Sequence, residues 1–232
     1  MSNRLLDFLA PTGLGLVCLA IGLSLFQLWQ PVVGFFPPGV IPFEKVLGLL
    51  PATYFRPAHL AWILVLGLFY YPLGERTAHR LLDLFLAAAV IWSVLRVLQF
   101  DYQSLDHLLN GLSTLDFFAG MLIIFVTLEV ARRSVGMIMT LVGLTFILYS
   151  LYGNYLPDVV ASKGFSVERM VRFQIFTNAG LFGAPLGIAA GAVFGFVLFG
   201  AFLQTTGAGK FLIDLSFALA GRYRGGPAKA SV

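Results

Sequence analysis

Apolar residues occur in long runs along this chain, and short polar segments separate the runs. A helix that crosses the roughly 30 Å hydrocarbon core of a bilayer needs about 20 predominantly apolar residues. The segments that approach this length are residues 8–29, 57–73, 81–100, 115–131, 135–152 and 181–203. Backbone polar groups in lipid must be satisfied internally, and no run alternates as a barrel strand would. The pattern therefore predicts an all-α, polytopic integral membrane protein with about six spans.

The connections between the runs contain helix breakers and two short amphipathic patterns. Residues 30–56 hold five prolines, which predict a break in helical structure against the membrane face. These are Pro31, Pro37, Pro38, Pro42 and Pro51. Residues 166–176 carry apolar side chains at helical spacing and charges elsewhere, which predicts a short interfacial amphipathic helix. Residues 210–221 predict a second one, after a break at residues 205–209.

Composition supports the membrane interpretation and excludes several classes. Apolar residues make up 59% of the chain and charged residues 11%, against about 25% charged in a soluble domain. The net charge of +4 is spread between the apolar runs, so no clustered basic face indicates nucleic-acid binding. Cys18 is the one cysteine, and no Cys/His cluster has metal-ligand spacing. We therefore expect no metal site and no tightly bound cofactor.

The first run could be mistaken for a signal peptide, because Arg4 precedes it. Residues 14–29 are long for such a segment, end in bulky side chains and lack a small-x-small cleavage pattern. We therefore expect a retained helix. The distribution of Lys and Arg near the span ends then favours a cytoplasmic N-terminus, with nine basic residues on the cytoplasmic side and five opposite.

Three ionisable residues lie inside predicted spans, where such groups are costly and suggest function. Asp83 lies near the start of its span, and we expect a local pair with Arg80. Arg96 lies four residues from the end of the same span and is expected to extend outward toward Asp101. Glu129 precedes Arg132 and Arg133 by three and four residues, the spacing of a helical ion pair. All three therefore fit structural charge pairs better than a transport carboxylate.

Glycine recurs every fourth residue in the last run, at Gly183, Gly187, Gly191 and Gly195. Glycines at this spacing form a groove along one helix face, which lets another backbone approach closely. Plain helix packing and packing inside a transport core explain the ridge equally well.

No catalytic pattern accompanies these features, so we expect that the chain is not an enzyme. Gly209-Lys210 resembles part of a P-loop, but Gln204 stands where the first glycine is required, and Phe211 where Ser or Thr must bind magnesium. The histidines lie near helix ends without a nucleophile beside them, at His59, His79 and His107.

Residues 178–232 resemble the fused membrane component of TRAP transporters, specifically the TAXI-type branch. The resemblance rests on GLFGAPLG (residues 180–187), FVLFGAFLQTTGAGKFLIDL (196–215) and GRYRGGPAK (221–229). RPAHLAW (56–62), YPLG (71–74) and STLDFFAGMLIIFVTLEVARRSVG (113–136) are similar to the family's small subunit. The resemblance thus covers nearly all of the chain.

The resemblance implies a division of the chain and a mechanism. Residues 1–133 would form the four-helix scaffold subunit, residues 134–178 a connector helix with an interfacial helix, and residues 179–232 the start of the large transport subunit. Such systems are secondary transporters that import small organic anions such as carboxylates, driven by a gradient of sodium or, alternatively, protons. A periplasmic TAXI-type substrate-binding protein delivers the substrate, and the large subunit moves as an elevator in a bacterial or archaeal cytoplasmic membrane.

The family pattern opens the first re-entrant hairpin at Gly225, Gly226, Pro227 and Lys229. Because the sequence stops at Val232, we expect the N-terminal part of a longer transporter, with the rest of the large subunit as a partner. The ion-ligating and substrate-binding residues are expected beyond Val232 and remain unknown. A non-transporting membrane scaffold or assembly subunit is the alternative function.

Overall fold

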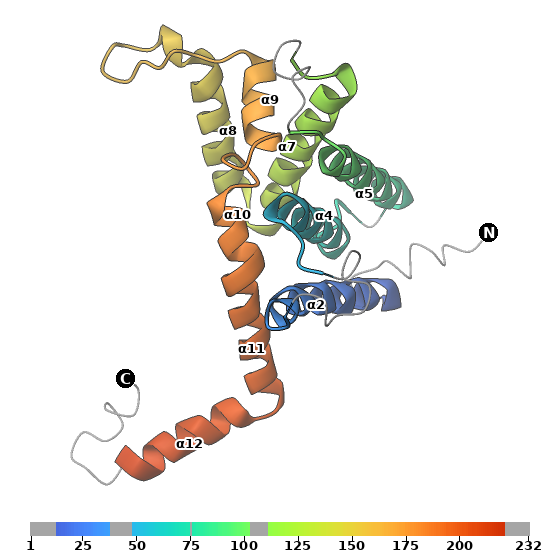
Figure 1. The fold of residues 1–232 in the computed structure, drawn as a ribbon, viewed down its shortest axis with the longest axis vertical. Helices are drawn as coiled ribbons and strands as arrows, with labels where there is room; N and C mark the ends of the chain where they lie inside the picture. Colours follow the sequence, from blue (N-terminus) through green and yellow to red (C-terminus); the bar gives the residue numbers. More distant parts are fainter. Residues whose placement is uncertain (1–12, 38–47, 75, 103–110, 221–232) are drawn as a thin grey trace. The chain divides into compact units, whose positions relative to one another are not determined.

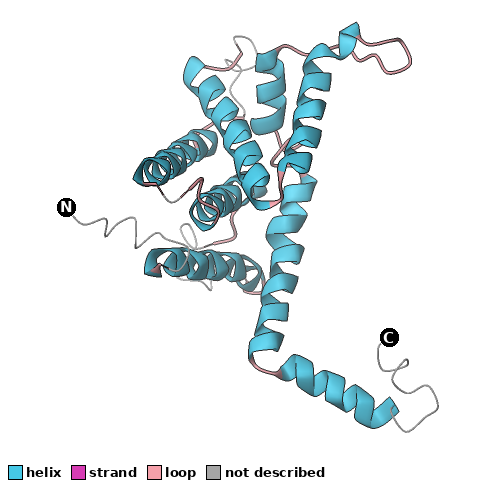
Figure 2. Cartoon of the chain, turned by 180° about the vertical axis from the view of Figure 1, so that it is seen from behind, coloured by secondary structure: helices cyan, strands magenta, loops and turns pink. Residues whose placement is uncertain are grey.

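The computed structural model describes residues 13–37, 48–74, 76–102 and 111–220, and every regular element within these ranges is a helix (Figures 1 and 2). The all-α prediction is therefore confirmed. In chain order, the elements are α2 (Leu14–Gly34), α4 (Ala52–Tyr70), α5 (Thr77–Leu98), α7 (Thr114–Ser134), α8 (Met137–Tyr152), η1 (Gly153–Tyr155), α9 (Val167–Ile175), α10 (Ala184–Ile188), η2 (Ala189–Val193), α11 (Phe194–Thr205) and α12 (Ala208–Ala220).

The described residues contain six helical segments that are long and apolar enough to cross a membrane. Their bounds are Leu14–Gly34, Ala52–Tyr70, Thr77–Leu98, Thr114–Ser134, Met137–Tyr155 and Ala184–Thr205. Each overlaps one of the predicted runs, which confirms a multi-pass membrane protein. The first span ends at Gly34, beyond its predicted end at residue 29, and the second begins at Ala52, before its predicted start at residue 57.

Two of these helices include a proline. The break predicted across residues 30–56 is narrower than expected, because α2 continues through Pro31 and α4 includes Pro57. A proline removes one backbone hydrogen bond from a helix. Membrane helices tolerate that loss where neighbouring helices and side chains compensate for it. Pro57 is fully buried against its neighbours.

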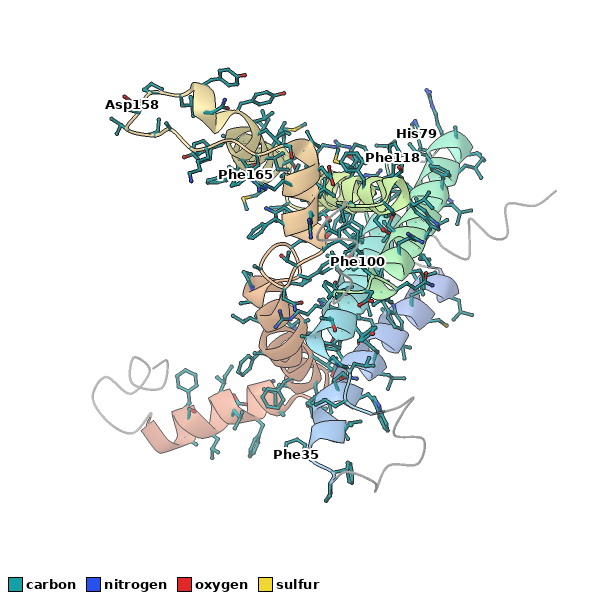
Figure 3. The ribbon with its side chains drawn as sticks, turned by 45° about the horizontal axis from the view of Figure 1, so that its top comes forward. Phe35, His79, Phe100, Phe118, Asp158 and Phe165 are labelled. Atoms are coloured by element: carbon teal, nitrogen blue, oxygen red, sulfur yellow. The ribbon has the colours of Figure 1, made fainter. Side chains whose placement is uncertain are left out.

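The chain divides into two compact units, Met1–Ala190 and Gly191–Val232. In the first unit, α4, α5 and α7 pack against one another, while α2 packs on α4 and α8 packs on α7 (Figure 1). The core of this unit consists of aliphatic side chains from the three central helices and of residues 170–182. Phe100, which follows the end of α5 and is labelled in Figure 3, packs on Phe176 with ring centroids 4.5 Å apart.

The outer surfaces of the spanning helices are apolar, as expected of helices that face lipid. The helix α8 has no buried residue at all, and Ile138 and Phe146 on it are 79% and 68% exposed. Gly136 makes the tight connection between α7 and α8, with φ of 113°. A side chain rarely adopts this backbone conformation, so glycine is required at that position.

The helix α9 differs from its prediction in what covers its apolar face. Met170, Val171 and Ile175 are buried, and α9 packs against α7 beside α8 (Figure 1). A Cβ atom on Gly120 of α7 would lie 2.5 Å from Val171, so glycine permits this close approach. Protein therefore covers the apolar face of this amphipathic helix, where a lipid interface was expected.

The second unit contains α11 and α12, and neither helix has a buried residue among those whose burial is described. The last candidate span begins as α10 and continues through the π-helical turn η2 into α11. Gly207, with φ of 73°, separates α11 from α12. Gly207 lies within the break predicted at residues 205–209, but the observed break is narrower, because α12 begins at Ala208, before the predicted start of the second amphipathic segment at residue 210.

Candidate functional site

A network of charged side chains lies where the end of α7 meets the start of α5. Arg133 Nη1 lies 2.6 Å from Asp83 Oδ1, and Arg133 Nε lies 2.7 Å from Glu129 Oε1. Glu129 also receives Arg132 Nε at 2.8 Å. The Arg133 and Asp83 side chains are 5% and 2% exposed. A buried charge is tolerated only when it is paired and hydrogen-bonded, and this network meets that condition.

The partner observed for Asp83 corrects the sequence-based expectation. A local pair with Arg80 was predicted, but the ion pair of Asp83 is with Arg133, fifty residues away. The Leu73 backbone N–H also donates to Asp83 Oδ2 at 3.1 Å, and Arg133 donates to the Tyr71 carbonyl at 3.3 Å. The network therefore also holds the connection between α4 and α5.

A second ion pair joins the opposite ends of α5 and α7. Arg96 donates to Asp116 Oδ1 from Nε at 3.0 Å and from Nη2 at 2.7 Å. Ser113 caps α7, since its hydroxyl accepts from the Asp116 backbone N–H at 3.2 Å and donates to Asp116 Oδ2 at 2.6 Å. The prediction that Arg96 extends toward Asp101 is corrected to a pair with Asp116. Neighbouring helices bring the two side chains together.

Uncharged polar side chains join α2 to α4, and the sequence analysis did not identify them. The buried Gln27 side chain contacts the ring nitrogen Nδ1 of His59. Gln30 Oε1 accepts from the Leu50 backbone N–H at 2.9 Å, and Trp62 Nε1 donates to the Leu19 carbonyl at 2.9 Å. The sequence feature that could have identified these contacts is a pair of glutamines, three residues apart, in an otherwise apolar run. Amide side chains at membrane depth seek partners on neighbouring helices.

Arg56 connects α4 to the GLFGAPLG segment. Its Nη1 atom donates to the Phe182 carbonyl at 2.9 Å. A Cβ atom on Gly187 would lie 2.8 Å from Arg56 Nε, so the absence of a side chain there leaves room for the guanidinium. The Phe182 side chain is itself fully buried in the first unit.

The four glycines of the predicted ridge have different surroundings. Gly183 is the N-cap residue of α10 and approaches backbone atoms of Ala179 and Gly180, while Gly187 approaches Arg56. A Cβ atom on Gly191 or Gly195 would meet no described atom within 4 Å. The hairpin motif, Gly225, Gly226, Pro227 and Lys229, lies outside the described residues.

These side chains act as structural contacts within and between the helices. Asp83, Arg96 and Glu129, the ionisable residues singled out within the spans, each have an oppositely charged partner. Within the part of the chain that the structure describes, no group of three or more His, Cys, Asp or Glu side chains could hold a metal ion. The arrangement joins α5 to α7, α2 to α4, and α4 to α10.

The comparisons with known proteins give one family match. Residues 122–232, just under half of the chain, match the family described as "Tripartite ATP-independent periplasmic transporter, DctM component". The match begins within α7, so it includes α8 and α9 as well as the glycine-rich segment. No curated protein matches the chain. No solved structure matches it either.

The six apolar helices show a multi-pass membrane protein, and residues 122–232 are similar to the DctM component of TRAP transporters. The family consists of transporter components, which favours a role in transport over enzymatic activity.

Proposed function

We propose that this chain is a permease component of a TRAP transporter of the TAXI-type branch, importing small organic anions such as carboxylates by secondary active transport. The observation that carries the proposal is the DctM family match over residues 122–232, which include the last two candidate membrane spans. Sodium is the proposed coupling ion, with the proton as the alternative. The proposed location is a bacterial or archaeal cytoplasmic membrane, with the N-terminus in the cytoplasm.

In this proposal the chain contributes two parts with different roles, joined by a connector. Residues 1–133 form a scaffold, residues 134–178 the connector, and residues 179–232 the start of the elevator-type transport domain. The ion pairs between α5 and α7 support the scaffold role, because they fix two membrane helices at both ends. The partners are a periplasmic TAXI-type substrate-binding protein, the lipid bilayer and the remainder of the large permease subunit.

The alternative function is a non-transporting membrane scaffold or assembly subunit. The pairing of Asp83, Arg96 and Glu129 favours it, because these paired groups serve packing rather than ion passage. Both functions assign the same structural role to the first unit, and they differ in whether the chain belongs to a transport-competent assembly.

Reconstitution into proteoliposomes distinguishes the two functions. The chain is incorporated alone, and in parallel with the remainder of the large subunit and the substrate-binding protein. Uptake of a radiolabelled carboxylate panel is followed with and without an inward sodium gradient. We expect no uptake by the chain alone and gradient-dependent uptake by the complete assembly. Uptake that is unaffected by leaving this chain out of the assembly would reject the transport role.

A further inference from the structure

Two cavities meet beside α9 in the first unit. One has a volume of about 230 Å³ and lies between α7, α8 and α9. The other, of about 490 Å³, adjoins α9 and the end of α8. Ser150, Met170 and Gln174 line both cavities, so the two adjoin each other and are together called the joined cavity. Cavities of about 300–1,000 Å³ are the size that holds small-molecule ligands.

The depth of the joined cavity follows from the positions of its residues along α8. Ser150 lies five residues before the end of the candidate span at Tyr155, or about 8 Å at the helical rise per residue. Gly143, which lines the smaller cavity, lies about 18 Å from the same end. In a hydrocarbon core of about 30 Å, the cavity therefore extends from near the interface to the bilayer centre.

Both cavities have mainly apolar linings with a few polar groups. The larger cavity is lined by Arg169, a cation whose guanidinium makes no hydrogen bond or ion pair with any residue that the structure describes. The amide of Gln174, five residues further along α9, lines the middle of the joined cavity. The smaller cavity is otherwise lined mainly by aliphatic and aromatic side chains, including Leu128, Phe146 and Ile147.

Arg169 is the one charged residue among those that line the two cavities. Its neighbour along α9, Glu168, is an acid. The Glu168 carboxylate accepts a hydrogen bond of 3.0 Å from the Leu112 backbone N–H. Arg169 therefore offers its charge to an external anion.

The smaller cavity has a mainly apolar lining, which includes Ile124, Leu128 and Phe146. Thr127 Oγ1 is a buried polar atom beside them that has no hydrogen-bond partner within the described ranges. An acyl chain fits the apolar part of this lining.

We propose that the joined cavity binds an anionic phospholipid. The phosphate lies at Arg169, the ester groups lie at the level of Gln174 and Ser150, and one acyl chain enters the space between α7 and α8. The site is a feature of the first unit and does not depend on the proposed transport function.

Native mass spectrometry of the detergent-purified full chain tests the site. Phosphatidylglycerol and phosphatidylcholine with identical acyl chains are titrated separately. We expect preferential binding of phosphatidylglycerol at one site, because only this lipid carries a net negative charge. The substitution Arg169→Gln is expected to weaken phosphatidylglycerol binding about fivefold and to leave phosphatidylcholine binding unchanged, since one basic residue near anionic lipid contributes about a fivefold preference.

Arg172→Gln is the matched control, because Arg172 lies on the same helix and lines neither cavity. We expect unchanged binding of both lipids by this variant. Ser150→Phe is expected to weaken binding of both lipids by filling the shared part of the cavity. Equal binding of the two lipids by the unmodified chain would overturn the proposal, as would equal losses for Arg169→Gln and Arg172→Gln. Arg169 is exposed, so its substitution keeps the fold even where Ser150→Phe does not.

Discussion

Arg133 has the most constrained environment of the charged residues described above. It contacts carboxylates on two helices, at 2.6 Å from Asp83 and 2.7 Å from Glu129, and its own side chain is 5% exposed. Arg132, its neighbour in the chain, contacts Glu129 from a side chain that is 35% exposed. Both arginines therefore contact Glu129, but the buried Arg133 contributes more to the stability of the fold than the more exposed Arg132.

Replacement of Arg133 by alanine should destabilise the first unit strongly. The change leaves Asp83, 2% exposed, without its ion-pair partner, and breaking a buried pair on one side costs about 3–5 kcal/mol. Chemical unfolding in detergent micelles, followed by circular dichroism, measures the free energy of unfolding. Arg132→Ala is the matched control and should leave it nearly unchanged. Similar losses for the two variants would contradict the assigned roles.

At the scale of single elements, the predicted spans agree with the observed helices in number and type, but their ends and their contacts differ. Long apolar runs indicate helices directly, because length and hydropathy are local properties. Proline was a poorer guide, since α2 and α4 both include one. For α9 the pattern predicted the helix, whereas its covering by α7 depends on Gly120, far away in the chain. Amphipathic spacing shows that a face is covered, but it cannot distinguish lipid from protein.

The two middle glycines of the ridge give a prediction at this scale. Gly187→Leu should displace Arg56 from the Phe182 carbonyl, because the new Cβ atom would lie 2.8 Å from Arg56 Nε. A hydrogen bond to a charged group contributes about 1.5–3 kcal/mol, so the melting temperature in detergent should fall by about 5 °C.

Gly191→Leu is the comparison variant. A Cβ atom at this position would meet no described atom within 4 Å, and leucine has a higher helix propensity than glycine. Its melting temperature should therefore stay the same or rise slightly. Its assembly with a partner membrane subunit, measured by co-purification, should decrease because the glycine groove is filled. Unchanged assembly would show that this part of the ridge is not a contact.

At the scale of the whole molecule, the distribution of basic residues predicts how the chain is threaded through the membrane. Arg132 and Arg133 lie at the end of α7, and Asp158 lies in the loop beyond α8 (Figure 3). With the N-terminus in the cytoplasm, the connection between α7 and α8 is cytoplasmic and the loop at Asp158 lies on the opposite side.

Cysteine labelling tests this orientation. Cys18 is the one native cysteine, and it is replaced by serine to remove background labelling. Asp158→Cys should then react with a membrane-impermeant maleimide in intact cells, whereas Val135→Cys should react only after permeabilisation. Both positions are exposed in the structure, so access depends on the membrane side. The reverse pattern would establish the opposite orientation.

Local patterns along the chain were enough to establish the class of protein, the number of candidate spans and the spacing of Glu129 with Arg132 and Arg133, because these depend on residues close together in the sequence. The partners of Asp83 and Arg96 came from the packed helices alone. Those partners lie fifty and twenty residues away, on a neighbouring helix. The pairing depends on which helices pack together and on which faces meet, and neither follows from the periodicity of any one segment.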